Sequence, residues 1–402
     1  MKVLYIGKYP PIEGGVSAGN YWLIRALGKR GIQVSVVTNA FVVEDMYREE
    51  LDLPHDHTHG AISDFQPANV HVHSLEKQAP SHIPYSPAYL SRIINLGLKV
   101  LGEHGGDVIY THYLEPYSAA GFVIKKITGL PLIVRHAGSD IYRILDNPDF
   151  KYFLGRVLQE ADRVLLSKSL SPLAQALNIP EKNICTVWRR VIDDSMFTPE
   201  GERFDFSKKN ITVPDGVPIF TYIGKANTNK GIIETIEALS GIKKDFRLLF
   251  VSKGKKLEEF KEKVAQHQLE EKVIFLDFVP PWVIPSILRA SSALLHLENN
   301  FPIPIHSPGQ PYEAIATQTP LIVSSEIHNK LKHSFPSTAP YFNVVKNVSD
   351  IDELRSIFLR VCDSPDEFQE HAQEIREEFL STNNWDAYID SYVELYRSLT
   401  KG

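Results

Sequence analysis

The sequence is poor in the features that mark secreted and membrane-spanning proteins. Two of its 402 residues are cysteines, Cys185 and Cys362, and they lie far apart. This gives no disulfide framework and favours a reducing compartment. No window reaches the roughly 18 apolar residues of a membrane span, and the first residues lack the apolar stretch of a signal peptide. We therefore expect a cytoplasmic protein and leave peripheral contact at the inner membrane face open.

The chain also lacks a strong charge of one sign. Its formal net charge is −6, from 43 basic and 49 acidic residues, which argues against nucleic acid as an electrostatic partner. A Walker loop and a catalytic Ser-His-Asp pattern are absent from the sequence as well. The length exceeds what one hydrophobic core usually supports, so two domains are expected.

Strand and helix patterns alternate along both halves of the chain. A strand at Lys2–Ile6, a loop, a helix at Ala18–Arg30 and a strand at Gln33–Thr38 form the usual first unit of a doubly wound parallel sheet. The other strands expected in the first half are Val70–His73, Val108–Thr111, Leu132–Arg135 and Arg163–Leu166. Those expected in the second half are Ile219–Ile223, Arg247–Ser252, Val273–Asp277, Ala293–Leu297 and Leu321–Ser324. The pattern predicts an α/β fold with two Rossmann-like, doubly wound parallel-sheet domains.

Proline and glycine mark the predicted boundary between the halves. Pro199, Gly201, Pro214 and Gly216 punctuate a charged stretch that follows Ile192. We predict a first domain of residues 1–197, a second of residues 198–384, and a final helix, 385–402, that packs back on the first domain. Residues 44–66 are polar and predict a long loop with at most a short helical turn.

Two loops of the first half are candidates for chemistry. Gly14 and Gly15 separate the first strand from the first helix, and glycine lets a backbone approach a phosphate or a sugar closely. A flexible turn explains them equally well, because the G-x-G-x-x-G fingerprint is absent. His136 follows a predicted strand, and its imidazole can donate to an oxyanion or a sugar hydroxyl, although a loop histidine without a role is the alternative. Asp140 is expected to cap a helix or to orient this loop.

Cations and backbone N–H groups gather in the second half. Lys225 ends the first strand there and Lys230 begins the next helix, so both side chains can converge on one diphosphate. A solvated surface charge is the ordinary alternative. The segment Pro308–Val323 runs from a turn into a helix headed by Glu313. A helix N-terminus carries about half a positive charge and binds phosphate, and Glu313 can also complement the helix dipole.

Two further patterns are less specific. Arg189 and Arg190 lie within Trp188–Asp193 and could bind an anionic ligand or pair with carboxylates. The alternating histidines of residues 55–59 have no obvious fourth ligand, so a polar loop is favoured over a metal site.

In their order and spacing, these motifs resemble the retaining glycosyltransferases of family four, which have the GT-B fold. Y-P-P-x-x-G-G-V around Gly14 resembles the family's first loop, and R-H-A-G-S-D around His136 resembles its H-G-S-D segment. Lys225 and Lys230 lie in a stretch that resembles its G-R…E-K-G motif, with Lys225 keeping the charge but not the bidentate geometry of the common Arg. P-G-Q-P-Y-E-A-I-A-T-Q-T-P resembles its P-x-K-x-x-E-x-x-A-x-G-x-P signature, and Thr111–Tyr113 resembles its A-H motif. The resemblance extends over most of the chain.

The resemblance implies retaining transfer from a nucleoside-diphosphate sugar to a glycan, lipid-linked or small-molecule hydroxyl acceptor. It implies two domains that face a central cleft, the first on the acceptor side and the second on the donor side. His136 would be the catalytic residue beside the donor sugar, and Glu313 would hold the ribose. The diphosphate would be held by Lys225, Lys230, Gly14, Gly15, Ser307 and Gly309, and the acceptor side would be formed by His112 and Arg190. Lysines and helix termini would neutralise the leaving group, so neither a metal nor a cofactor is expected.

The chain departs from the family pattern at several positions. Gln310 stands where Lys is common, and Gln318 stands where Gly is usual. Ile305 occupies the position of a second Glu that lies near the donor sugar in the family, with His306 and Glu298 nearby but out of register. These departures keep a non-catalytic GT-B module that binds a nucleotide or a glycan open as an alternative, and a nucleotide-sugar epimerase as another. A phosphorylase would need a Lys motif for pyridoxal phosphate, which the sequence does not show.

Overall fold

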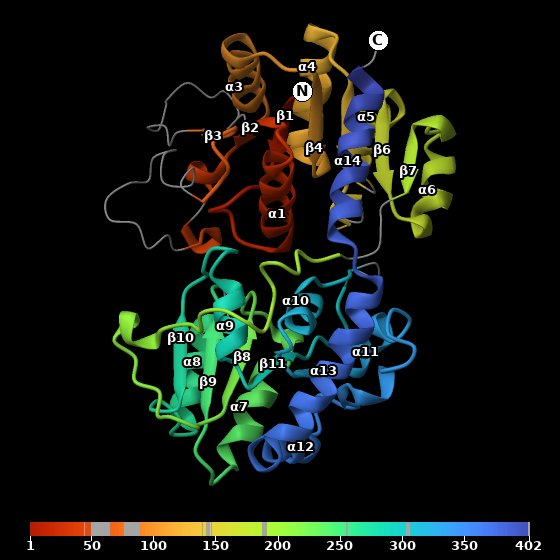
Figure 1. Cartoon of the computed structure of the whole chain (residues 1–402). Helices are drawn as coiled ribbons and strands as arrows, with labels where there is room; N and C mark the ends of the chain where they lie inside the picture. Colours follow the sequence, from red (N-terminus) through yellow and green to blue (C-terminus); the bar gives the residue numbers. More distant parts are fainter. Residues whose placement is uncertain are drawn as a thin grey trace. The chain divides into compact units, whose positions relative to one another are not determined.

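Two parallel sheets organise the chain (Figure 1). The first has seven strands in the order β3-β2-β1-β4-β5-β6-β7, and the second has six in the order β10-β9-β8-β11-β12-β13. The neighbouring strands pair in parallel throughout both sheets. Parallel neighbours need crossover connections, which the helices between successive strands supply. The predicted α/β fold with two parallel-sheet domains is confirmed.

The chain divides into two compact units. The first comprises Met1–Arg189 with Asp386–Gly402, and the second comprises Arg190–Trp385. The sequence predicts the corresponding boundaries after residues 197 and 384. The computed structural model describes residues 1–43, 45–49, 65–75, 89–138, 140–141, 145, 147–186, 191–254, 256–302 and 306–400.

The first unit combines the start of the chain with its last helix. Its strands are β1 (Lys2–Gly7), β2 (Gln33–Thr38), β3 (Val70–Ser74), β4 (Val108–His112), β5 (Leu132–Arg135), β6 (Arg163–Leu166) and β7 (Ile184–Thr186). Its α-helices are α1 (Gly15–Lys29), α3 (Tyr89–His104), α4 (Ala119–Thr128), α5 (Pro148–Glu160), α6 (Ser171–Ala176) and α14 (Trp385–Thr400). Helix α1 begins at Gly15 and not at the predicted Ala18, because Gly14 takes the N-cap position with a φ of 109°.

Helix α14 packs on the first sheet through tyrosines, and its ribbon lies with the strands of that unit in Figure 1. The rings of Tyr392 and Tyr396 lie 6.0 and 6.1 Å from that of Tyr110 in β4. The guanidinium of Arg135, at the end of β5, donates to the Tyr392 hydroxyl at 2.7 Å and to the Tyr388 hydroxyl at 3.3 Å. The last helix thus completes the core of a unit whose sheet comes from the start of the chain.

The second unit is a contiguous stretch with a core rich in phenylalanine. Its strands are β8 (Ile219–Ile223), β9 (Arg247–Val251), β10 (Val273–Leu276), β11 (Ala293–His296), β12 (Leu321–Ser324) and β13 (Asn343–Val345). Its α-helices are α7 (Ile232–Ser240), α8 (Leu257–Gln266), α9 (Ile284–Ala290), α10 (Gln310–Ala316), α11 (Ser325–Leu331), α12 (Ile351–Asp363) and α13 (Pro365–Thr382). Its core contains Phe220, Phe246, Phe250, Phe260 and Phe358.

Strand order changes direction once within each sheet. In the first sheet β1 lies between β2 and β4, and in the second β8 lies between β9 and β11. The loops that follow the two diverging strands leave toward opposite sides, so a crevice opens at their carboxyl ends. Ligands of doubly wound sheets bind at this switch point. Each unit therefore has one topologically defined place for a site.

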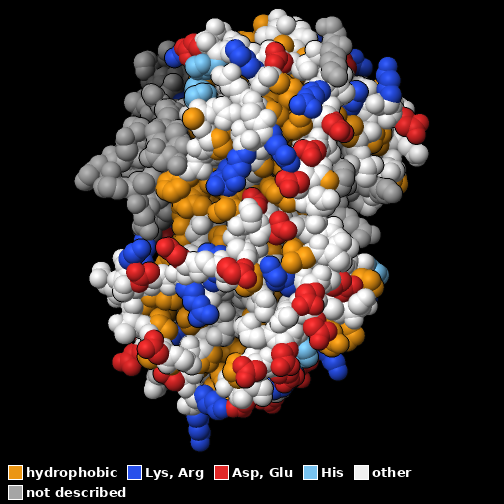
Figure 2. Space-filling view, viewed as in Figure 1, with side chains coloured by type: hydrophobic (Ala, Val, Ile, Leu, Met, Phe, Trp, Pro, Cys, Tyr) orange, Lys and Arg blue, Asp and Glu red, His pale blue; other side chains and the backbone are white. Residues whose placement is uncertain are grey.

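Charges of both signs are dispersed over the face of the molecule that Figure 2 shows. Figure 2 shows basic and acidic side chains interspersed on the visible face, in keeping with the small net charge of −6. Among the residues that the structure describes, no helix has the length and apolar character needed to cross a membrane.

Gln318, between α10 and β12, has an unfavourable backbone conformation. Its φ is 55°, in the left-handed region that costs a residue with a Cβ about 1–2 kcal/mol. The N–H of Gln318 bonds to the Ile315 carbonyl at 3.0 Å, and the N–H of Thr319 bonds to the Ala314 carbonyl at 2.8 Å, so this turn ends the helix. Glycine, which is usual here in the family signature, adopts this conformation without strain.

Replacing Gln318 by glycine is expected to leave the free energy of unfolding unchanged or to raise it by up to about 1.5 kcal/mol. Relief of the left-handed strain, about 1–2 kcal/mol, is opposed by the conformational entropy of glycine, about 0.5–1 kcal/mol. Gln318→Val should destabilise the protein, because a β-branched residue fits this conformation worst. Denaturant titration of the three proteins measures the order, and a glycine variant less stable than the valine variant would contradict it.

Candidate functional site

The first unit presents the start of a long helix at its switch point. The loop after β1 ends at Gly14, and no side chain of the described residues caps α1. A side chain at Gly14 would be strained by its φ of 109°, whereas a Cβ at Gly15 would meet nothing within 4 Å. The start of α1 is therefore open, and its first N–H groups suit an anion.

His112 ends β4 on the other side of this switch point and lies inside the unit. Its Nδ1 is 2.8 Å from Asn20 Oδ1 and its Nε2 is 3.1 Å from the carbonyl oxygen of His136. The Asn20 amide also donates to the Lys8 carbonyl at 2.9 Å. Burial, followed by the charge of Arg135, lowers the pKa of His112 well below its usual range. With 6% of its surface exposed, His112 braces the loops after β1 and β5; its predicted place on the acceptor side stays a prediction.

Asp140 shapes the loop that carries His136. Its buried carboxylate accepts the backbone N–H of Ala137 and that of Leu114, each at 3.0 Å. These bonds confirm that Asp140 orients the loop. The N–H of Gly138 donates to His136 Nδ1 at 3.0 Å, so Nδ1 is an acceptor and Nε2 carries the proton of the neutral ring.

His136 is held in its neutral form. Burial, aided by the charge of Arg135, lowers the pKa of His136 to about 4. At physiological pH the ring therefore offers Nε2–H as an uncharged hydrogen-bond donor. A preorganised donor of this kind stabilises negative charge that develops on a reacting group.

The predicted lysines of the second unit lie on the loop after β8, at the switch point of the second sheet. Lys225 is exposed and Lys230 is half-buried. Gly231, with a φ of 68°, separates Lys230 from α7, and a Cβ there would come within 2.7 Å of Leu297 Cβ. The helix therefore begins at Ile232 and not at the predicted Lys230. Glycine allows the lysine loop to lie against the end of β11.

A buried carboxylate meets Lys230 from across this switch point. Glu298, which follows β11, is 1% exposed, and its Oε1 forms an ion pair with Lys230 Nζ. The same oxygen lies 3.2 Å from His306 Nε2 and 3.6 Å from His296 Nε2. Burial raises the pKa of Glu298, but His296, His306 and Lys230 outweigh burial and hold the pKa well below its usual range. Glu298 is therefore ionised and fixes Lys230 at the carboxyl edge of the sheet.

The Pro308–Val323 segment runs through α10, in the crossover from β11 to β12, and ends within β12. Ser307 is exposed and Gly309 is half-buried. Glu313 lies in the first turn of α10, and its N–H donates to the Gly309 carbonyl at 3.2 Å. These residues thus share a crossover with Glu298.

The structure places the predicted residues on two separate units. Gly14, Gly15, His112 and His136 lie on loops of the first, whereas Lys225, Lys230, Ser307, Gly309 and Glu313 lie in the second. Arg189, Arg190, Ile305 and residues 55–59 fall outside the described residues. Within the described part of the chain, no group of His, Cys, Asp and Glu side chains is arranged to hold a metal ion.

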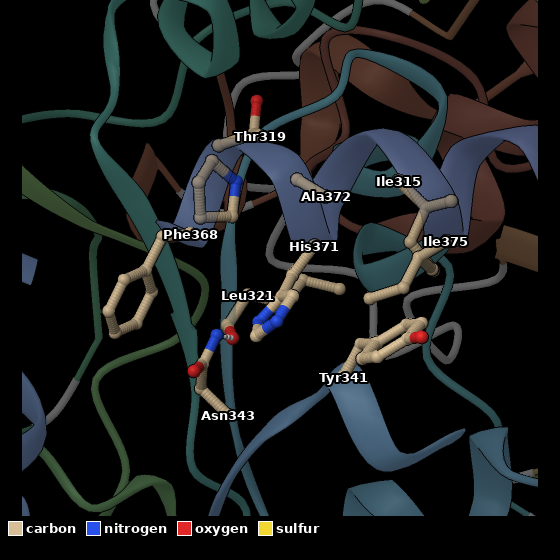
Figure 3. Close-up of a pocket in the computed structure, with 10 residues that line it drawn as sticks. Ile315, Thr319, Leu321, Tyr341, Asn343, Phe368, His371, Ala372 and Ile375 are labelled. Atoms are coloured by element: carbon tan, nitrogen blue, oxygen red, sulfur yellow. Dashed lines mark hydrogen bonds between the residues drawn. The ribbon is translucent and has the colours of Figure 1, made fainter. Parts of the chain in front are cut away.

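A small pocket of the second unit lies away from these residues. Apolar side chains of α10, β12 and α13 line it, and the rings of Tyr341 and His371 stack at its side with centroids 5.0 Å apart (Figure 3). Across the strands, Asn343 donates to the Leu321 carbonyl at 3.2 Å. None of the predicted site residues lines this pocket, and we interpret it as a packing gap behind α10.

Family models match both units. The model described as "Glycosyl transferase 4-like domain" matches residues 14–187, which include the His136 loop. The model described as "Glycosyl transferases group 1" matches residues 203–332, which include both lysines and Glu298. The chain belongs to the family-four-like glycosyltransferases of the GT-B fold.

Several known glycosyltransferases are similar to this chain over most of its length. A protein of Bacillus subtilis strain 168 named as a teichuronic acid biosynthesis glycosyltransferase, TuaC, is 22% identical over 306 residues, which cover 71% of this chain and 75% of the relative. Anabaena HepE, in complex with UDP and glucose, has a TM-score of 0.69 at 16% identity over 99% of this chain and 100% of its own. Sucrose-phosphate synthase from Thermosynechococcus elongatus has a TM-score of 0.66 at 16% identity over 99% of each chain. At these identities the structural likeness concerns the fold.

Glu298, like its partners His296 and His306, has no predicted role, although it lies at the centre of the candidate site. The sequence does contain a signal, because a carboxylate directly follows an apolar strand, where ligand-binding side chains of parallel sheets stand. Its partner Lys230 is distant in sequence, and the fold alone brings the two together.

The lowered pKa of His136 predicts a pH dependence of stability. The unfolded chain protonates this residue near pH 6.5 and the folded chain only near pH 4, so the free energy of unfolding falls as the pH drops from about 6.5 toward 4. When the pH falls from about 7 to about 5, the free energy of unfolding of wild-type protein should therefore fall by up to about 2 kcal/mol more than that of His136→Gln. Denaturant titrations at both pH values measure this difference. Identical losses in the two proteins would show that His136 is not held neutral by the fold.

Proposed function

We propose that this glycosyltransferase moves a sugar, with retention of anomeric configuration, from a nucleoside-diphosphate donor to a hydroxyl acceptor, using neither a metal nor a cofactor. The observation that carries the proposal is the presence of Lys225 and Lys230 on one loop at the switch point of the second sheet. Two cations at such a crevice suit a diphosphate. The HepE structure with UDP and glucose supports the same class of donor.

The chemistry of the leaving group explains why lysines are suited to the site. The bond between the anomeric carbon and the β-phosphate oxygen breaks, and negative charge develops on the departing diphosphate. Fixed cations stabilise that charge more in the transition state than in the ground state. The acceptor hydroxyl attacks on the face that the diphosphate leaves, and a phosphate oxygen takes its proton. No protein nucleophile is required.

The remaining residues take roles that fit their surroundings. The Nε2–H of His136 donates to the donor sugar or its phosphate, and Glu313 binds the ribose. The open start of α1 and the backbone of Ser307–Gly309 add N–H groups for the phosphates. His112 and Arg190 lie on the acceptor side, where a glycan, a lipid-linked or a small-molecule acceptor binds. We place this reaction in the cytoplasm, with peripheral contact at the inner membrane face open.

A non-catalytic module that binds a nucleotide or a glycan is the second candidate function. One observation favours it: the charge of Lys230 is already neutralised by Glu298, whereas stabilisation of a leaving diphosphate needs net positive charge. Such a module would need the lysines and Glu313 but not His136. The two functions therefore differ in what they require of the first unit.

Sugar transfer measured in excess EDTA separates the two functions. Wild-type protein should transfer or slowly hydrolyse the sugar of UDP-, GDP- or ADP-hexose, and EDTA should not lower the rate. His136→Ala should reduce turnover by about a hundredfold or more, as expected for lost transition-state contacts, with little change in nucleotide affinity. Glu313→Ala should mainly weaken donor binding.

The matched control is His328→Ala, which changes a histidine of the second unit whose Nε2 lies 3.1 Å from the Ala339 carbonyl. It should keep wild-type turnover. Nucleotide binding without turnover over a broad acceptor panel would favour the binding module. Activity lost to EDTA and restored by Mn²⁺ or Mg²⁺ would refute metal independence, and full turnover in His136→Ala would remove its catalytic role.

Loss of either lysine should weaken nucleotide-sugar binding about tenfold or more, because a charge-assisted hydrogen bond is worth about 1.5–3 kcal/mol. Lys225→Ala changes an exposed residue and is the cleaner variant. Lys230→Gln leaves Glu298 without its cation, so thermal unfolding must be measured alongside. Lys263→Ala is the control, since Lys263 pairs with Glu237 at 3.9 Å on two helices of the same unit. Calorimetric titration that shows unchanged affinity in both site variants would rule out the diphosphate role.

A further inference from the structure

His306, beside the lysine loop, has one ring nitrogen fixed by a buried carboxylate. Its Nε2 lies 3.2 Å from Glu298 Oε1. An ionised carboxylate only accepts hydrogen bonds, so Nε2 carries the proton and donates. The ring of Phe301 stacks on the imidazole with centroids 4.2 Å apart and 29° between the planes. These two contacts fix both the position and the rotation of the ring.

The second ring nitrogen of His306 is suited to a ligand. In a neutral ring with its proton on Nε2, Nδ1 is a hydrogen-bond acceptor. Within the described part of the chain, Nδ1 receives no hydrogen bond, and the side chain is 31% exposed. Glu298 accepts the Nε2–H and thereby fixes the tautomer of the ring, as carboxylates do for histidines at metal sites.

The position of His306 points to the sugar part of the donor. Lys230 Nζ and His306 Nε2 contact the same carboxylate oxygen, so the imidazole lies within about two hydrogen-bond lengths of a lysine assigned to the diphosphate. The transferred sugar is bonded directly to that diphosphate. A side chain this close can therefore reach a hydroxyl on the sugar ring.

Lys230, Glu298, His296 and His306 form one polar cluster. The first three are less able than His306 to accept a hydrogen bond from a sugar hydroxyl. Lys230 offers only donors. Glu298 is 1% exposed and His296 is 7% exposed, so both lie beneath the surface. His306 is the member of the cluster that combines exposure with an acceptor.

We propose that His306, positioned by Glu298, reads the donor sugar by accepting a hydrogen bond from one of its hydroxyl groups at Nδ1. The proposal rests on the proposed function, because it takes the lysine loop as the diphosphate site.

The test compares binding of a nucleotide with binding of the same nucleotide carrying its sugar. The pairs are UDP with UDP-glucose, GDP with GDP-mannose and ADP with ADP-glucose, and the pair that binds wild-type protein is used. The ratio of the two dissociation constants isolates the contribution of the sugar. His306→Phe keeps an aromatic ring against Phe301 but has no acceptor, and His306→Gln places its polar end near the position of Nε2. His306→Asn keeps an acceptor oxygen on Cγ, the carbon that bears Nδ1.

We expect the sugar contribution to fall about threefold to tenfold in His306→Phe and His306→Gln, the size of one hydrogen bond. His306→Asn should retain most of it, and in His306→Phe and His306→Gln the affinity for the nucleotide alone should fall less than the affinity for the nucleotide sugar. The control is His328→Phe. His328 is also partly buried, and its ring centroid lies 5.9 Å from that of Phe342. This variant should match wild type in both affinities.

Donors that lack a single sugar hydroxyl identify the group that His306 contacts. One of these donors should bind wild-type protein and His306→Phe with equal affinity, because it lacks the hydroxyl that His306 contacts. The hydrogen bond is then absent from both complexes. If every deoxy donor loses the same factor in both proteins, His306 contacts no hydroxyl and the proposal is overturned.

Two other results would also overturn it, and they bear differently on the proposed function. Equal losses of nucleotide and nucleotide-sugar affinity in His306→Phe and His306→Gln would make His306 a diphosphate or packing residue and leave the donor class intact. Unchanged binding of both ligands in these variants would show that His306 contributes to neither affinity, and it would also leave the donor class intact. If wild-type protein binds none of the three pairs, the proposed function and this inference fail together.

Discussion

Parallel strands oblige the chain to cross from one end of a sheet to the other, and β1 and β8 stand where the crossovers change direction. The loops after β1 and β4 part at the first of these places, and those after β8 and β11 part at the second. In the second unit, the ion pair between Lys230 and Glu298 spans the opening. A buried carboxylate is tolerated only with its donors around it, so the lysine loop, His306 and the end of β11 are fixed as one group.

The two units offer different kinds of polar group to a ligand. In the first, burial and the charge of Arg135 keep His112 and His136 neutral, and Arg135 itself is held by tyrosine hydroxyls. In the second, Lys230 is paired with a carboxylate, while Lys225 is exposed. The first unit thus presents an uncharged donor, the Nε2–H of His136, and the second unit presents cations.

Local sequence was enough to predict most of the strands. It predicted only part of the candidate site. Strands β5, β8 and β12 occupy the residues predicted for them, because each is an apolar run bounded by turn residues. Strands β7 and β13 have three residues each, too few for a periodic pattern. Helix α11 was missed although Ser324 caps it by accepting the Ile327 N–H. The motif residues were predicted as contiguous stretches, whereas the importance of Glu298 depends on Lys230 and His306, which only the fold brings to it.

The tyrosine contacts of α14 have a consequence for the order in which the chain matures on the ribosome. Tyr392 and Tyr396 complete a core whose strands lie before residue 190, while residues 190–385 form a contiguous unit of their own. Translation adds about 5–20 residues per second, so the first sheet emerges many seconds before its last helix. The second unit can therefore reach its final state first. We therefore expect the second unit to mature before the first, so that a holding chaperone would find its substrate in the earlier half of the nascent chain.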